Sequence, residues 1–325
     1  MKNNPGGGRR VLLLAACVAA LSHAPLHAQD YPSAPVTIVV PYGPGSYTDN
    51  VIRPLAAVLQ KALGQPVVID NKAGAGGIIG TQHAARAKPD GYTLLAGSST
   101  TLAANAGLFK NLPYDPRKDF VPLAGVASTS MMFMVRADFP ARDLKSFLAH
   151  AASQIEALAV GYGSSSAQVA LALLSKESGA KFIGVPYKGT PQAITDLIGG
   201  QVPVAIVDVA NGVPQMRSGK LHALAISGAA RSASAPDVPT LAETWPGTQL
   251  VTWVGLVAPA GTPAAIVQRL STAVGAAVES PELRQKFATI ATEADPASAQ
   301  ELGQRMTRDF GLWLDLMKAA GIQPE

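Results

Sequence analysis

Short apolar runs alternate along most of the chain with longer segments in which apolar residues recur at helical spacing. The run Val36–Val40 is continuous and of strand length, whereas residues 51–63 repeat apolar positions at helical spacing before Gly64. This alternation predicts an α/β fold in which parallel sheets are covered by helices on both faces. Further strands of the first sheet are expected at residues 67–69 and 92–95, with a helix at 77–87 between them.

The same pattern restarts after the apolar run at residues 131–135 and predicts a second sheet. Its strands are expected at residues 158–160, 182–185, 204–207 and 223–226, and its helices at 167–178 and 191–198, with Thr190 as the cap of the latter.

The C-terminal part reads as one strand, at residues 253–257, followed by helices only, at 263–278, 281–288 and 297–319. Helices without strands of their own must pack on a sheet that already exists. The chain is therefore expected to return to its first lobe, crossing between lobes near residues 126–135 and 251–258, which makes a hinge. The predicted organisation is residues 29–128 with 252–325 as lobe 1 and residues 129–251 as lobe 2.

The N-terminus has the three-part layout of a signal peptide, with basic residues, an apolar run at 11–21 and small residues ending at Ala28. That run is too short for a bilayer span, which needs about 20 residues. We expect residues 1–28 to be removed by cleavage near Ala28 and the mature protein to be periplasmic. A second possibility is a lipid anchor at Cys17, because small residues precede it.

Cys17 is the only cysteine of the chain, so cleavage near Ala28 leaves none. A disulfide framework, thiol catalysis and cysteine metal sites are then excluded. Loss of Lys2, Arg9 and Arg10, with no acidic residue, lowers the formal net charge from +4 to +1. A nearly neutral protein has no electrostatic basis for binding nucleic acid or a membrane surface.

Three loops rich in glycine and hydroxyl groups follow predicted strands and lead into predicted helices, which is where α/β folds bind ligands. Free backbone N–H groups at such helix starts favour an anion. Each loop alone is explained equally well by helix capping, but three of one character favour a ligand site. The candidate ligand-binding residues in these loops are Tyr42, Gly43, Gly45, Ser46, Tyr47, Thr48, Asp49, Ser98, Ser99, Gly163, Ser164, Ser165 and Ser166.

Two further candidates lie at other strand ends. Asp208 follows an apolar strand. Its carboxylate would either accept a hydrogen bond from an ammonium or hydroxyl group of a ligand, or accept hydrogen bonds from nearby backbone N–H groups. Tyr187 lies at a strand-to-helix junction and is a candidate for the cleft. Its neighbour Lys188 either lines the cleft or is an ordinary surface lysine, and the second is the commoner case.

Catalytic motifs are incomplete, so we expect no enzyme and no cofactor or metal. Residues 163–167 approach the G-x-S-x-G nucleophile elbow but end in alanine, and a nucleophile at Ser165 would need a base. His83, His150 and His222 have no sequence context that marks one. Residues 74–80 approach a dinucleotide loop, but the last glycine arrives one residue late, and tight packing at a helix start is the simpler role.

Ten stretches together resemble the Bug (TctC-type) solute receptors of tripartite tricarboxylate transport systems. The resemblance implies a type II, Venus-flytrap-like periplasmic binding protein with a two-strand hinge. It also implies a small carboxylate, or a related amide or aromatic acid, gripped by the loops at 41–49 and 161–166, and delivery to transporter membrane subunits. A sensor kinase as partner is the alternative, and a monomer is expected. The stretches lie at residues 31–35, 41–49, 64–68, 74–77, 89–95, 112–116, 185–189, 196–202, 237–240 and 258–263.

The chain departs from the family pattern at its candidate site. Ser46 stands where a second glycine is usual, and Pro44 and Tyr47 replace smaller or differently shaped residues. The Tyr47 ring would narrow the pocket or stack on a ring of the ligand. Gln168 and Ala172 stand where the family usually has His and Glu, so those two roles are not carried over. Gln168 is kept as a candidate ligand-binding residue.

Overall fold

The computed structural model describes residues 31–319 and 321–324. The predicted signal peptide and Cys17 lie outside the described residues. All helices and strands given below belong to one contact unit, Ala34–Glu325. Its strands form a sheet of mixed direction in the order β2-β1-β3-β9-β4-β7-β5-β6, with β10 and β8 also paired to β4.

The first lobe contains strands from the N-terminal part of the chain and from its C-terminal part. β1 pairs in parallel with β2 and β3, and β9 joins antiparallel between β3 and β4. The strands are β1 (Val36–Val40), β2 (Val67–Asn71), β3 (Thr93–Ser98), the first part of β4 (Phe120–Arg136), β9 (Val251–Pro259) and β10 (Glu293–Ala297).

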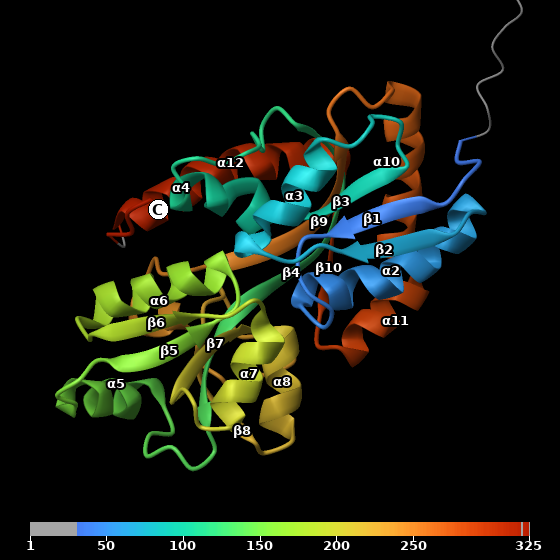
Figure 1. Cartoon of the computed structure of the whole chain (residues 1–325). Helices are drawn as coiled ribbons and strands as arrows, with labels where there is room; N and C mark the ends of the chain where they lie inside the picture. Colours follow the sequence, from blue (N-terminus) through green and yellow to red (C-terminus); the bar gives the residue numbers. More distant parts are fainter. Residues whose placement is uncertain (1–30, 320, 325) are drawn as a thin grey trace, which may run out of the picture. The chain divides into compact units, whose positions relative to one another are not determined.

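Helices cover both faces of this sheet (Figure 1). One group packs around α2, which contacts α10 and α11, and the other brings α12 against η3 and α4. The helices are α2 (Tyr47–Leu63), η2 (Ala75–Gly77), α3 (Ile78–Ala85), η3 (Thr100–Ala104), α4 (Asn105–Leu108), α10 (Ala264–Glu279), α11 (Pro281–Thr289) and α12 (Ala299–Ala319). Gly64 ends α2 in the left-handed conformation, as predicted.

The second lobe continues the sheet through β4. β5 pairs in parallel with β6 and β7, whereas β7 and β8 pair antiparallel with β4. Its elements are α5 (Leu144–Ser153), β5 (Leu158–Tyr162), α6 (Ser165–Ser178), β6 (Phe182–Pro186), α7 (Thr190–Ile198), β7 (Val204–Asp208), α8 (Val209–Arg217) and β8 (Leu221–Ile226); a short helix, α9 (Leu241–Thr244), follows.

Alternation along β4 sorts the core of the second lobe into two layers. Met131, Phe133 and Val135 are buried with residues of α5 and α6, whereas Met132 and Met134 are buried with residues of α7 and α8. Successive side chains of a strand point to opposite faces. The continuous apolar run that predicted this strand therefore reflects a sheet covered on both sides.

The hinge lies where β4 changes partners (Figure 1). Residues up to Ser130 pair with β9, and residues from Met131 onward pair with β7 and β8. Ser227, which follows β8, bonds to both crossing segments. Its N–H donates to Met131 O in β4 (2.7 Å), and its hydroxyl donates to Leu250 O, just before β9 (2.6 Å). The predicted two-lobed class with two crossing strands is confirmed, while the lobe boundaries stay predictions.

Two sequence predictions need correction. Two separate parallel sheets were predicted, but one sheet of mixed direction runs through both lobes, because the long strand β4 belongs to both and β4 and β9 run antiparallel to their neighbours. The C-terminal part does not consist of helices alone, since β10 pairs with β4. The sequence of β10 shows no strand pattern, because it lacks β-branched residues and contains Pro296. Its pairing with β4 is also interrupted by a register shift.

Candidate functional site

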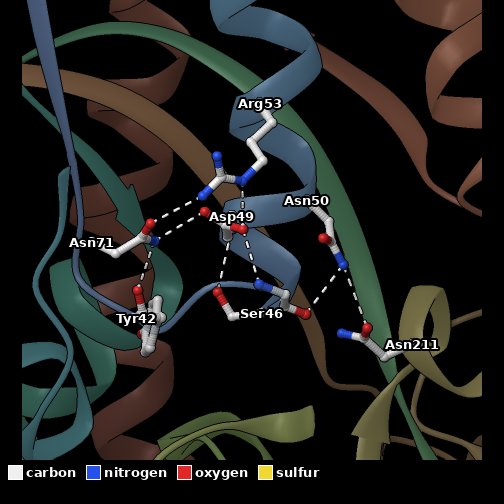
Figure 2. A network of polar contacts seen from close by, with 8 residues as sticks. Tyr42, Ser46, Asp49, Asn50, Arg53, Asn71 and Asn211 are labelled. Carbon is white, nitrogen blue, oxygen red and sulfur yellow. Dashed lines mark hydrogen bonds and ion pairs between the residues drawn. The ribbon is translucent and has the colours of Figure 1, made fainter. Parts of the chain in front are cut away.

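The loop before α2 is held in place by a buried carboxylate (Figure 2). Asp49 accepts hydrogen bonds from Gly45 N (2.9 Å), Arg53 Nε (2.8 Å) and Asn71 Nδ2 (2.9 Å). Ser46 is the N-cap, and its hydroxyl accepts from Asp49 N (3.3 Å). Burial by itself would raise the pKa of Asp49, but the hydrogen bonds from Arg53, Gly45 and Asn71 outweigh it and hold the pKa below its usual value.

These contacts make Asp49 a support for the loop. Neither Asp49 nor Gly43 nor Gly45 is among the residues that line the cavity described below. Gly45 has φ of 78°, so its glycine serves the turn. The loop's other candidates, Tyr42, Ser46, Tyr47 and Thr48, do line the cavity.

The end of β3 presents a buried hydroxyl without a partner. Ser99 is fully buried and lines the cavity, yet its Oγ makes no hydrogen bond to any described residue. By contrast, the hydroxyl of its neighbour Ser98 lies 3.1 Å from Tyr42 Oη. The following turn, η3, is a π-helix, a form that is frequent at functional sites.

The serine loop before α6 contacts the first lobe directly. Ser164 caps α6 by accepting from Ala167 N (3.2 Å). Ser165 donates to Asn105 Oδ1 (3.1 Å), and Ser166 Oγ lies 2.8 Å from Thr100 Oγ1. The first serine thus shapes the helix start, and the next two link the lobes.

Asp208 forms part of the wall of the second lobe. It is the N-cap of α8 and accepts from Asn211 N (2.9 Å), which is the backbone role considered for it. It also lines the cavity. Burial raises the pKa of the Asp208 carboxyl above its usual value, although hydrogen bonds from Asn211 oppose the shift. Across the lobes, Asn50 Nδ2 lies 3.5 Å from Asn211 Oδ1 (Figure 2).

The hinge strands supply a part of the site that the sequence did not identify. Thr129 and Met131 of β4 and Thr252, Trp253 and Val254 of β9 line the cavity. The indole Nε1 of Trp253 donates to Asp309 Oδ2 (2.7 Å), which fixes the ring against α12. The crossings themselves were predicted, but not which of their side chains face the cavity. Three successive residues of β9, at 252–254, line it, so period-2 alternation alone would not have separated them.

Residues of the β6–α7 junction and of η3 complete the cavity. Thr190 was predicted as the N-cap of α7, but Gly189 holds that place without a side-chain bond. Gly189, Thr190 and Thr100 line the cavity and were not among the candidates.

The cavity between the lobes has a volume of about 50 Å³ and a wall of hydroxyl groups, glycines and aromatic rings. The starts of α2, α6, α7 and α8 all reach it, through Ser46, Ser164, Thr190 and Asp208. Asp208 is the one charged residue among its lining residues, and no lysine, arginine or histidine joins it there. This set offers hydrogen-bond donors and helix N-termini, which suit an anion.

Ser165, Gln168 and Tyr187 line a second, adjoining cavity instead. It shares Tyr42, Gly163 and Ser164 with the first. Of the sixteen candidates, therefore, the structure brings Tyr42, Ser46, Tyr47, Thr48, Ser98, Ser99, Gly163, Ser164, Ser166 and Asp208 to the first cavity.

The nucleophile considered at Ser165 bonds to Asn105. His83 and His150 lie in α3 and α5, and the ring of His222 contacts Arg142 O. Within the ranges 31–319 and 321–324, no cluster of three metal-ligating side chains occurs. Over the same residues, no helix combines the length and apolar character that a bilayer crossing requires.

Two lobes, a hinge of two strands and a polar cavity between them are the features of a two-lobed solute-binding protein. The chain matches the model of the tripartite tricarboxylate transporter family receptor (TctC) over residues 51–322, and it belongs to this family. The family resemblance inferred from the sequence is thereby confirmed.

Solved structures agree with this assignment. The chain is similar to the periplasmic binding protein BugD, with 32% identity and a TM-score of 0.86 over 91% of this chain and 100% of that one. It is also similar to MatC from Rhodopseudomonas palustris with bound malate (34% identity, TM-score 0.83, 88% and 99% covered). A third structure, an R. palustris protein with adipate, gives 30% identity and a TM-score of 0.87, with 91% and 100% covered.

Proposed function

We propose that this chain is an extracytoplasmic receptor that captures a small organic carboxylate between its lobes and delivers it to the membrane subunits of a tripartite tricarboxylate-type transporter. Export with cleavage near Ala28 is part of the proposal. It binds its solute without chemical conversion. Support for a carboxylate comes from the donor-rich cavity and from the malate and adipate held by the two R. palustris proteins.

The observation that carries the proposal is the unpartnered hydroxyl of Ser99. A buried polar group without a hydrogen bond lowers the free energy of unfolding by about 1–3 kcal/mol. Ser99 Oγ is such a group, and it lies in the wall of the cavity. A carboxylate oxygen at that position would accept its hydrogen bond, and the N-termini of α2 and α6 would stabilise the negative charge.

The direct test is a calorimetric and thermal-shift titration with short monocarboxylates, di- and tricarboxylates, amino acids and aromatic acids. A ligand at 100 times its dissociation constant stabilises a receptor by about 2.7 kcal/mol. We expect at least one class of acid to give this response. A panel in which no acid shifts the melting temperature would contradict the proposal.

Replacement of Ser99 by alanine should weaken carboxylate binding. A hydrogen bond to a charged group contributes about 1.5–3 kcal/mol, so the dissociation constant should rise by about 10- to 100-fold. Stability without added ligand should not fall, because the lost hydroxyl makes no hydrogen bond to any of the residues that the structure describes. Isothermal titration of the responding acid measures the first effect, and thermal melting measures the second.

Ser271 offers a matched control. Its hydroxyl is also buried and without a partner among the described residues, but it lies on α10 and is not a lining residue of the cavity. Ser271→Ala should leave the dissociation constant unchanged. Equal affinities of the Ser99→Ala variant and the wild type would contradict a ligand contact at Ser99.

Replacement of Asp208 by asparagine should separate two classes of ligand. Asparagine also caps helices, so α8 keeps its start, while the wall loses its one carboxyl. Plain dicarboxylates should bind about tenfold more tightly, because repulsion from a nearby negative charge is removed. Amino acids whose ammonium pairs with Asp208 should bind about tenfold more weakly. Calorimetric titration of both classes decides, and equal changes would contradict this role.

The pH dependence of stability gives a second readout for Asp208. Because its folded pKa lies above the ordinary value, ionisation of the buried carboxyl costs free energy of unfolding as the pH rises through the interval between the two. Asp208→Asn removes this cost. The variant should therefore melt at the same or a higher temperature than the wild type at neutral pH, and the difference should shrink in acid.

A further inference from the structure

Asn105 is a buried polar residue that lies outside both cavities and bonds to both lobes. It is the first residue of α4 in the first lobe, is fully buried, and lines neither the cavity between the lobes nor the adjoining one. Its Nδ2 donates to Gly76 O (3.1 Å) within the first lobe. Its Oδ1 accepts from Ser165 Oγ (3.1 Å) at the start of α6 in the second lobe. One side-chain amide therefore joins a turn of one lobe to a helix of the other.

The turn that Asn105 holds presents its backbone to the second lobe. All four residues at 74–77 have positive φ, including Ala75 at 47°, and only glycine adopts such angles freely. A Cβ at Gly77 would lie 2.7 Å from Thr101 Cγ2, and a Cβ at Gly76 would lie 3.2 Å from Ser165 Oγ. The turn is thus packed closely against the serine that bonds to Asn105.

Apolar packing accompanies this hydrogen bond. Helix α12 contacts η3 and α4 of its own lobe and also α6 of the second lobe (Figure 1). Its residues Trp313 and Met317 are buried in one core cluster with Leu108 of α4 and Ala170 of α6. Separation of the lobes at this point would expose apolar surface to water and would break the bond to Asn105.

The other hydrogen bonds between the lobes are longer or belong to the cavity. Asn50 Nδ2 lies 3.5 Å from Asn211 Oδ1, at the limit for a hydrogen bond (Figure 2). Thr100 Oγ1 and Ser166 Oγ lie 2.8 Å apart, but both residues line the cavity between the lobes, where a ligand would compete for their hydroxyls. The contact at Asn105 can therefore act on the lobes without acting on the ligand.

We infer that Asn105 determines the affinity of the receptor without touching its ligand. Its bond to Ser165 and the packing of α12 on α6 stabilise the arrangement in which the lobes are closed. The observed dissociation constant equals the intrinsic one divided by the fraction of closed molecules. Loss of the contact therefore weakens every ligand by the same factor. This inference rests on the proposed function, because it assumes that capture requires closed lobes.

The test is a double-mutant cycle, read by calorimetric titration with malate and adipate as probes. Ser165→Ala removes the bond between the lobes and should raise the dissociation constants of both acids by one common factor of about 2 to 10. In an Asn105→Ala background, Ser165→Ala should have no further effect, because the bond is already absent. If Asn105 only stabilised the first lobe, the two substitutions would act independently.

Ser178→Ala is the matched control. Ser178 is the last residue of the same helix, its hydroxyl donates to Leu174 O within α6 (2.6 Å), and it lines neither cavity. This variant should keep both dissociation constants.

Independent effects of the two substitutions, or a different factor for each acid, would overturn the inference and leave the proposed function intact. If Asn105→Ala does not fold, the comparison of the two acids in Ser165→Ala still decides. A wild type that binds no acid of the panel would overturn both the inference and the proposed function.

Discussion

Replacing Gly163 by alanine should abolish measurable ligand binding. A Cβ at this position would lie 2.2 Å from the carbonyl carbon of Gly189 and 2.2 Å from Thr190 N. Both are backbone atoms, so the methyl group can be accommodated only if the serine loop and the β6–α7 junction move apart. Gly163, Gly189 and Thr190 all line the cavity between the lobes. Separation of the two segments would therefore change the shape of the cavity.

The same clash should lower the free energy of unfolding by about 3 kcal/mol, the upper part of the range for overpacked sites. Calorimetric titration with the responding acid measures binding, and thermal melting measures stability. Gly275→Ala is the control, because a Cβ there meets nothing within 4 Å and Gly275 lies inside α10. It should leave binding unchanged and raise stability slightly. A Gly163→Ala protein that binds like the wild type would contradict the packing.

The second large effect is expected from Asp49→Ala. The substitution removes the acceptor of Gly45 N, Arg53 Nε and Asn71 Nδ2 at once. Because the Arg53 side chain is 52% exposed, water can solvate its charge once Asp49 is gone, and loss of the buried acceptor should lower the free energy of unfolding by about 1–3 kcal/mol. The loop that carries Ser46 and Tyr47 into the cavity would lose its support, so ligand affinity should fall as well. Denaturant unfolding and calorimetric titration measure the two effects.

The sign of the pH dependence follows from the lowered pKa of Asp49. A carboxyl whose folded pKa lies below its unfolded value stabilises the protein fully above the unfolded value, and this contribution disappears as the pH falls through the folded pKa. The difference in stability between the wild type and Asp49→Asn should therefore shrink in acid. A difference that stays constant would show that the carboxylate charge is not what holds the loop.

Asp138→Ala provides a comparison for Asp49. Asp138 pairs with Arg136 at 2.7 Å, but the aspartate side chain is 69% exposed. Exposed ion pairs contribute little to stability because solvent screens them. The Asp138 variant should unfold close to the wild type, so that a large effect at Asp49 reports burial and multiple bonds rather than the loss of an ion pair in general.

Much of the fold could be predicted because burial leaves a pattern in the sequence. Strands such as Val36–Val40 are covered on both faces and appear as continuous apolar runs. β4 shows the limit of this signal. Only its second part, near residues 126–135, was predicted, whereas its first part contains Pro122 and Gly125 and is a strand because it pairs with β9 through two register shifts. Partners distant in sequence override local preference there.

The candidate site divides in a similar way. Ser46, Ser164 and Asp208 were identifiable because each follows a strand or turn and caps a helix, a local arrangement with a residue signature. Thr129, Thr252 and Trp253 were not, because a threonine or tryptophan in a strand has no feature that marks a cavity. Their inward direction depends on how β4 and β9 twist between the lobes, which is a property of the pairing.

β4 also determines how the lobes can move. Its backbone is an unbroken strand from Phe120 to Arg136, with different neighbours on either side of Ser130. Relative rotation of the lobes therefore twists a hydrogen-bonded ribbon elastically and does not swing a free loop. β4 therefore tolerates substitutions but not insertions. One inserted residue would turn Met131, Phe133 and Val135 to the opposite face of the sheet and exchange the two core layers of the second lobe.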